Sequence, residues 1–177
     1  FFTNGTEVFR MFQLAGAYGV IQAHGSGSDN YPNYTFSGDT DTGMFRAAAN
    51  QLAFTTASTE RMRIDNSGNV LVGTTAAAPQ NFSSGSGTQV SDGYVAVARG
   101  GSLAFFNRIS TDGDLVEFKK NGSIVGTVAT TSNRISIGSN DVGLFFDSTN
   151  ERLTPIHQTN QVDRDAAIDL GYASSQF

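Results

Sequence analysis

The sequence predicts an all-β fold, built from serial short β-hairpins or meander repeats in an elongated body. Three observations support this prediction: apolar and polar residues alternate with a period of two, Gly and Asn turns separate the alternating stretches, and one short unit recurs along the chain. Alternation with this period is typical of half-buried strands. Helix-like sequence is scarce, and residues 163–170 are expected to form one helical turn at most.

The recurring unit is an apolar strand, a polar turn and a second strand. Its fullest copy is "LAFTTASTERMRI", and a catalytic signature would be built once, so four copies indicate architecture. The copies occupy residues 1–11, 52–64, 103–118 and 144–156. Three of them begin with a strand of pattern L-x-F, at residues 52–54, 103–105 and 144–146, which places Phe54, Phe105 and Phe146 in equivalent positions.

Alternation along the second copy assigns one face to its large apolar residues, namely Leu52, Phe54, Met62, Ile64, Val70 and Val72. A lone hairpin is marginally stable in water, so such units must stack on one another or on other chains. We therefore expect the chain to fold only as a homotrimer that buries this face. The predicted structural core consists of Phe54, Met62, Ile64, Phe105, Phe146 and Leu153.

Turn residues and composition divide the chain into modules. Asn121-Gly122 predicts a two-residue hairpin, and residues 66–69 predict a turn between two strands. The expected order is the end of a preceding repeat plus a loop at 1–30, a β module at 31–75, a Gly/Ser-rich linker at 76–92, β modules at 93–130 and 131–158, and a connector to a distal region at 159–177. Because the chain begins with Phe1, we also expect a region upstream.

The bulk composition excludes several classes of function. Hydrophobic residues make up 38% and charged residues 15% of the chain, below the usual ~45–50% and ~25%, which favours a thin oligomeric body over a thick private core. The net charge of −5, without a Lys/Arg cluster, argues against a nucleic-acid partner. The absence of Cys excludes thiolate chemistry, and no apolar run approaches the ~20 residues that would span a membrane.

Candidate chemical groups are few, and each has a structural explanation. Asp39 and Asp41 are candidate cation ligands in a stretch that begins like a calcium loop. A bidentate Glu should stand at the twelfth position of such a loop, where this chain has Asn50, so a polar turn is favoured. His24 and His157 lie too far apart in the sequence to suggest a metal pair. We expect no metal centre and no cofactor.

Acidic residues give no strong hydrolase signature. The pairs Glu60-Arg61 and Glu151-Arg152 recur with the repeat, so we expect each residue to pair across strands or chains. The densest acidic patch surrounds a turn and contains Asp112, Asp114 and Glu117. We therefore predict that the chain is not an enzyme.

Four stretches resemble modules of tail-fibre proteins from tailed bacteriophages, of the marine and cyanophage type. Residues 34–75 include "FSGDTDTGMFR" and "ERMRIDNSGNVLVGTT", and they are similar to one module of these fibres. "RISTDGDLVEFKKNGSIVGTV" resembles another module, and "AAIDLGYASSQF" resembles a segment that precedes a distal domain. Some of these fibres end in a self-cleaving chaperone domain, whose catalytic Ser/Lys region has no match here.

The resemblance implies an intertwined homotrimeric shaft on a virion, with a structural and adhesive role in host attachment. Its partners would be two further copies, other tail or baseplate proteins, and a host surface glycan or protein, without membrane insertion. We expect receptor contacts in loops, at His24, Asp29, Tyr31, Tyr34, Asn81 and Phe82. The alternatives are a tailspike-type enzyme that degrades polysaccharide, or a bacterial surface adhesin or extracellular filament subunit.

Overall fold

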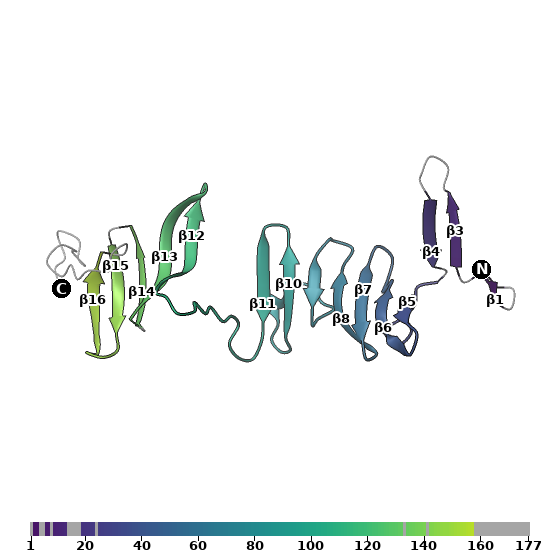
Figure 1. The fold of residues 1–177 in the computed structure, drawn as a ribbon, viewed down its shortest axis with the longest axis horizontal. Helices are drawn as coiled ribbons and strands as arrows, with labels where there is room; N and C mark the ends of the chain where they lie inside the picture. The colour runs from purple at the N-terminus through teal and green to yellow at the C-terminus, as the bar shows by residue number, and fades with distance from the viewer. Residues whose placement is uncertain are drawn as a thin grey trace. The chain divides into compact units, whose positions relative to one another are not determined.

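The computed structural model describes residues 2–3, 6–7, 9–13, 19–23, 25–132, 134–140 and 142–157. Their regular structure consists of sixteen β-strands and one three-residue 3-10 helix, so the prediction of an all-β fold is confirmed (Figure 1). The helical turn expected at 163–170 lies outside the described residues. The chain forms two compact units, Phe1–Leu103 and Ala104–Phe177.

The first unit contains two small antiparallel strand pairs and a seven-stranded sheet. β1 (Phe2–Thr3) pairs with β2 (Thr6–Glu7), and β3 (Phe9–Gln13) pairs with β4 (Gly19–Ala23). The large sheet is an antiparallel meander in which strands adjacent in the sequence are adjacent in space. Its strands are β5 (Tyr34–Phe36), β6 (Asp39–Phe45), β7 (Leu52–Thr56), β8 (Thr59–Ile64), β9 (Val70–Val72), β10 (Gly87–Ser91) and β11 (Tyr94–Ala98).

The second unit contains a five-stranded antiparallel meander. Its strands are β12 (Gly113–Lys120), β13 (Ser123–Thr131), β14 (Arg134–Ser139), β15 (Val142–Asp147) and β16 (Arg152–Ile156). Asn121 and Gly122 join β12 to β13 with φ values of 51° and 80°. Two consecutive positive φ values define the turn that matches the twist of a two-residue hairpin, which confirms the predicted turn.

The β7–β8 hairpin shows how the repeated unit folds. Its two turn residues, Ala57 and Ser58, have φ values of 48° and 56°, so the polar turn has the same hairpin geometry. Phe54 is aligned with Met62 and Thr55 with Glu60, which leaves Arg61 as an extra residue in a β-bulge. The bulge places Glu60 and Arg63 on the same side of the sheet.

Two features differ from the expected module plan. Residues 87–91, within the predicted linker, form β10 and pair with both neighbours. Residues 103–105, predicted as a strand from the L-x-F pattern, belong to no strand. The correction has a simple physical reason: a strand needs a hydrogen-bonding neighbour, and the described chain pairs none with this segment, whatever its local preference.

Candidate functional site

Register aligns the large apolar residues of the first unit into two rows on one face of the seven-stranded sheet. One row runs from Leu52 through Ile64 and Val70 to Val90 and Val95. The other aligns Met44, Phe54, Met62 and Val72, and ends through Thr88 at Val97. We call this the first apolar face: Met44, Leu52, Phe54, Met62, Ile64, Val70, Val72, Val90, Val95 and Val97.

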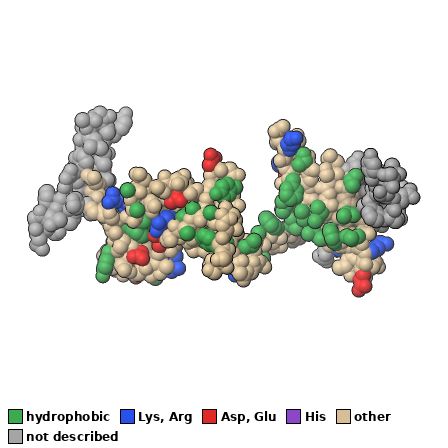
Figure 2. All heavy atoms as spheres, turned by 180° about the vertical axis from the view of Figure 1, so that it is seen from behind, with side chains coloured by type: hydrophobic (Ala, Val, Ile, Leu, Met, Phe, Trp, Pro, Cys, Tyr) green, Lys and Arg blue, Asp and Glu red, His purple; other side chains and the backbone are tan. Residues whose placement is uncertain are grey.

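The second unit repeats this arrangement. One row joins Val116, Val128, Ile137, Leu144 and Pro155, and a parallel row joins Ile135, Phe146 and Leu153. These eight residues are the second apolar face. No residue that defines either face is charged. Figure 2 shows hydrophobic side chains gathered on each of the two units.

Both apolar faces are open in the single chain. On the first, Ile64 is 38% and Val95 64% exposed; on the second, Phe146 is 41% and Leu153 59% exposed. Such exposure of contiguous large apolar residues is typical of an interaction surface. Of the predicted core, Phe54, Met62 and Ile64 therefore meet on one face, and Phe146 and Leu153 on the other.

Phe105 belongs to neither face and is 81% exposed. Phe54 is the cross-strand partner of Met62, and Phe146 is the partner of Leu153, so the second and fourth copies of the repeat are structurally equivalent. The third copy lacks this pairing. Burial of the three Phe side chains by neighbouring chains stays a prediction.

The opposite face of the first sheet is closed by the chain itself. Its buried residues include Ala53, Thr55, Leu71 and Gln89. The Thr55 hydroxyl donates to the carbonyl of Asp29 at 2.9 Å, and the backbone amide of Ala78 donates to Gln89 Oε1 at 2.6 Å. Ala78 precedes the 3-10 helix η1 (Pro79–Asn81), so two loops are attached to this face by buried polar side chains.

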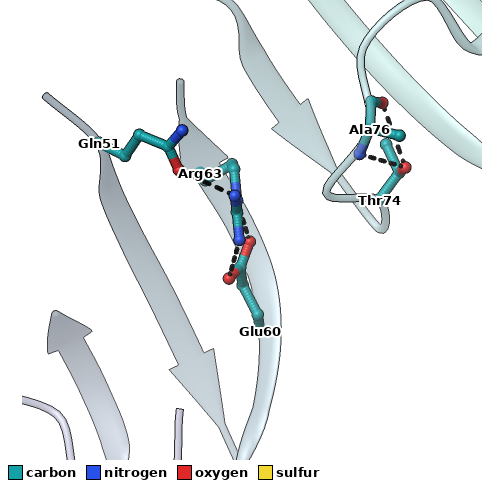
Figure 3. A network of polar contacts seen from close by, with 5 residues as sticks. All are labelled: Gln51, Glu60, Arg63, Thr74 and Ala76. Carbon is teal, nitrogen blue, oxygen red and sulfur yellow. Dashed lines mark hydrogen bonds and ion pairs between the residues drawn. The ribbon is translucent and has the colours of Figure 1, made fainter. Parts of the chain in front are cut away.

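An ion pair on this closed face corrects one expectation. Arg63 donates to both carboxylate oxygens of Glu60 at 2.5 and 2.6 Å, and to Gln51 Oε1 at 2.9 Å (Figure 3). The hydrogen bond to Glu60 is the main cause that raises the pKa of Arg63. Glu60 was expected to pair across strands or chains; within the single chain, the bulge at Arg61 instead turns it toward Arg63 of its own strand. Arg61 instead donates across the hairpin to Thr56.

The second unit has a charged centre on its closed face, which the sequence did not indicate. Asp147 is 4% exposed and lies 3.3 Å from Arg134 and 3.4 Å from Arg152. Its carboxylate also accepts hydrogen bonds from the backbone amides of Thr149 and Asn150. The side-chain hydrogen bond from Asn150 is the largest influence on the pKa of Asp147 and, with the other partners, keeps it below its ordinary value despite burial. The pairing of Arg152 across strands is confirmed.

A related carboxylate, that of Asp65, closes the turn between β8 and β9. It accepts hydrogen bonds from the backbone amides of Ser67 and Asn69 and from the Asn69 side chain. Burial favours the neutral acid, but these hydrogen bonds outweigh it and lower the pKa of Asp65. Asp65 and Asp147 therefore have the same local role in the two units.

Asp41 of the candidate cation ligands, and Asp112 and Glu117 of the acidic patch, have structural partners. Asp39 and Asp41 lie on β6, and Asp41 accepts a hydrogen bond from Ser58 at 3.0 Å. Asp112 caps the backbone amide of Ser132, and Glu117 pairs with Lys119. In the described part of the chain, no group of three or more His, Asp or Glu side chains is arranged to hold a metal ion.

The predicted receptor-contact residues that the structure describes lie in the loop before β5, on β5 and at η1. Asp29 and Tyr31 lie in the loop before β5, where Tyr31 is 75% exposed. Tyr34 instead lines an apolar groove of about 540 Å³ together with Phe36, Met44 and Phe54. The remaining residues are Asn81, at the end of η1, Phe82, which follows it, and His24, which lies outside the described residues.

Comparisons with protein-family models, curated proteins and solved structures find no match for this chain. Among the described residues, no helix is long and apolar enough to cross a membrane.

Proposed function

We propose that this chain is a structural and adhesive segment of a bacteriophage tail fibre, in which three copies form a shaft that contributes to host attachment. The main support is the pair of open, uncharged apolar faces. A chain with net charge −5 repels its own copies over most of its surface. Association through faces without charge avoids this repulsion, and each large apolar side chain that becomes buried contributes roughly 1.5–3 kcal/mol.

The similarity of residues 34–75 and 108–128 to tail-fibre modules supports the choice of a fibre over other oligomers. In such a shaft the apolar faces turn inward and the loops outward. Exposed loop residues such as Tyr31 are then presented three times. Weak contacts to a host surface would gain strength by avidity, because the second and third contacts form at a high effective concentration.

Sedimentation at micromolar concentration tests the assembly. We expect a particle of three times the 18.7 kDa chain mass. Phe54→Ser should remove the trimer, because Phe54 lies in the first apolar face. Tyr31→Ser is a matched aromatic-to-serine control outside both faces and should remain trimeric. A folded wild-type monomer at this concentration would refute the proposal.

Two further assays separate the proposed function from its alternatives. Trimer should bind to cells from a panel of bacteria more tightly than the Phe54→Ser chain, without shortening their surface polysaccharide. Shortening of the polysaccharide would favour a tailspike-type enzyme. Immunogold labelling of phage particles would show the chain on the tail, whereas labelling only of bacterial surfaces would favour an adhesin or filament subunit.

A further inference from the structure

Residues 103–109 have the sequence of a strand without a partner. Leu103-Ala104-Phe105 repeats Leu52-Ala53-Phe54 of β7 residue for residue. β7 is paired on both sides, with β6 and β8, whereas residues 103–109 form no strand. The segment exposes four large apolar side chains: Leu103 at 56%, Phe105 at 81%, Phe106 at 62% and Ile109 at 78%.

Among the edge strands of the two large sheets, β11 is the one best suited to accept another strand. The register of β5 shifts at Thr35/Phe36 and that of β12 shifts twice, while β16 contains Pro155. Bulges and proline on edge strands prevent unwanted pairing. β11 has the sequence YVAVA, pairs with β10 in unbroken register, and contains neither proline nor charge.

We propose that residues 103–106 of one copy pair with β11 of a neighbouring copy and form an intermolecular strand. This inference rests on the proposed oligomer and identifies how its chains are joined. Leu103 and Phe105 would project to the same side as Val95 and Val97 and extend the first apolar face. Ala104 would then lie on the same side as Ala96 and Ala98, since side chains alternate along strands.

The contact is heterologous, because a segment of one chain meets the edge of the next. Such contacts close into a ring when the rotation between copies allows it. In a three-fold ring, every segment would pair with a β11 edge and every β11 edge would have a strand partner. The participating residues, 94–98 and 103–106, are all uncharged, so the acidic chains meet without repulsion here. β11 is the last strand of its sheet, so its outer backbone groups have no strand partner within the sheet. Pairing with the segment would give these groups hydrogen-bond partners and would bury apolar side chains of the segment.

Introduced cysteines test the contact directly, because the chain has none of its own. One chain would have Ala98→Cys, and a second chain, lengthened by a tag, would have Ala104→Cys or Phe106→Cys. After co-assembly and mild oxidation, we expect mixed disulfide dimers, since paired strands bring Cα atoms within disulfide reach. In the control, Asp92→Cys replaces Ala98→Cys and should give few mixed dimers, because Asp92 lies in the turn that joins β10 to β11.

The doubly substituted chain, Ala98→Cys with Ala104→Cys, distinguishes neighbouring copies from self-pairing. Intermolecular pairing gives covalent oligomers on a denaturing gel. An intrachain disulfide without mixed dimers would overturn the inference, because the segment would then fold back on its own β11.

Hydrogen exchange of the unmodified chain gives an independent measurement. In the trimer, amides of residues 103–106 should exchange on the order of a hundredfold more slowly than in the Phe54→Ser monomer, as amides in paired strands do. A trimer with fast exchange at 103–106 and no mixed dimers would overturn this inference and leave the proposed function standing. A monomeric wild-type chain would overturn both.

Discussion

The two large sheets place their large apolar residues alike, but the polar interactions on their closed faces differ. In both, the Leu and Phe of the L-x-F pattern lie on the open face. The closed face of the first sheet is attached to loops by neutral hydrogen bonds, from Thr55 to Asp29 and from Ala78 to Gln89, and its ion pair of Arg63 with Glu60 lies within one strand. The closed face of the second sheet has a buried carboxylate, Asp147, between two arginines.

This comparison shows that hydrophobicity alone would not identify the buried face of a single chain. Many of the buried residues are small or polar, such as Thr55 in one sheet and Ser136 and Thr154 in the other, and Leu71 and Ile156 are buried with them. Many large apolar residues of the two open faces stay exposed. The chain therefore contains one set of residues for its own packing and a second set available for partners.

The most sensitive test of the similarity between the two sheets is to introduce a charged residue into each apolar face in turn. Ile64 and Ile135 are matched targets, with exposures of 38% and 40% on the first and second apolar faces. Ile64→Asp and Ile135→Asp should each abolish the trimer in sedimentation, because burying an uncompensated charge costs several kcal/mol.

Ser84→Asp, in an exposed loop, is the control and should stay trimeric. If Ile135→Asp leaves the trimer intact while Ile64→Asp removes it, only the first apolar face contacts neighbouring chains. The two sheets would then be alike in strand pairing but not in their role in assembly.

A smaller difference concerns two strand glycines, each near a bulged edge. A Cβ at Gly43 would lie 1.8 Å from the carbonyl oxygen of Tyr34, whereas a Cβ at Gly126 would lie 3.2 Å from that of Gly138. Gly43→Ala must displace β5 and should lower the free energy of unfolding of the first unit by about 1–3 kcal/mol.

Gly126→Ala should change the stability of the second unit by less than about 1 kcal/mol, since the small clash is offset by the reduced chain entropy of the unfolded state. Chemical denaturation followed by hydrogen exchange of each unit measures both effects. Equal losses at the two positions would show that β5 can move away from Gly43 at little cost.

Much of the fold was predictable from local sequence. Alternation determines which side chains share a face, so the alignment of Phe54 with Met62 and of Phe146 with Leu153 follows from the strand pattern and the turn length. Asn121-Gly122 predicts its hairpin because few other residue pairs adopt two positive φ values easily.

The remaining features depend on contacts that the pattern does not show. Gln89 lies in "GTQVS", which resembles a polar linker, yet its amide is buried against a loop eleven residues away. The bulge at Arg61 changes the partner of Glu60 without altering the alternation on either side. Asp147 looks like an ordinary turn residue, and its two arginines come from neighbouring strands.

The smallest expected effect is a difference in acid sensitivity between the two turn carboxylates. Hydrogen bonds lower the pKa of both Asp65 and Asp147 in the folded chain. A carboxylate with a lowered folded pKa stabilises the fold fully above its unfolded value, about 3.9, and loses this contribution as the pH falls through the folded value. The temperature at the midpoint of thermal unfolding should therefore decrease when the pH is lowered below about 4.

Asp147 has two arginine partners in addition to its amide donors, so the second unit should lose more stability in acid than the first. Asp147→Asn removes the titrating group and should flatten the pH dependence of the second unit, whereas Asp65→Asn should flatten that of the first to a lesser degree. Unit-resolved hydrogen exchange on a pH series measures both slopes. An unchanged slope in Asp147→Asn would mean that other carboxylates govern acid unfolding, and that the buried charged centre does not distinguish the second sheet from the first.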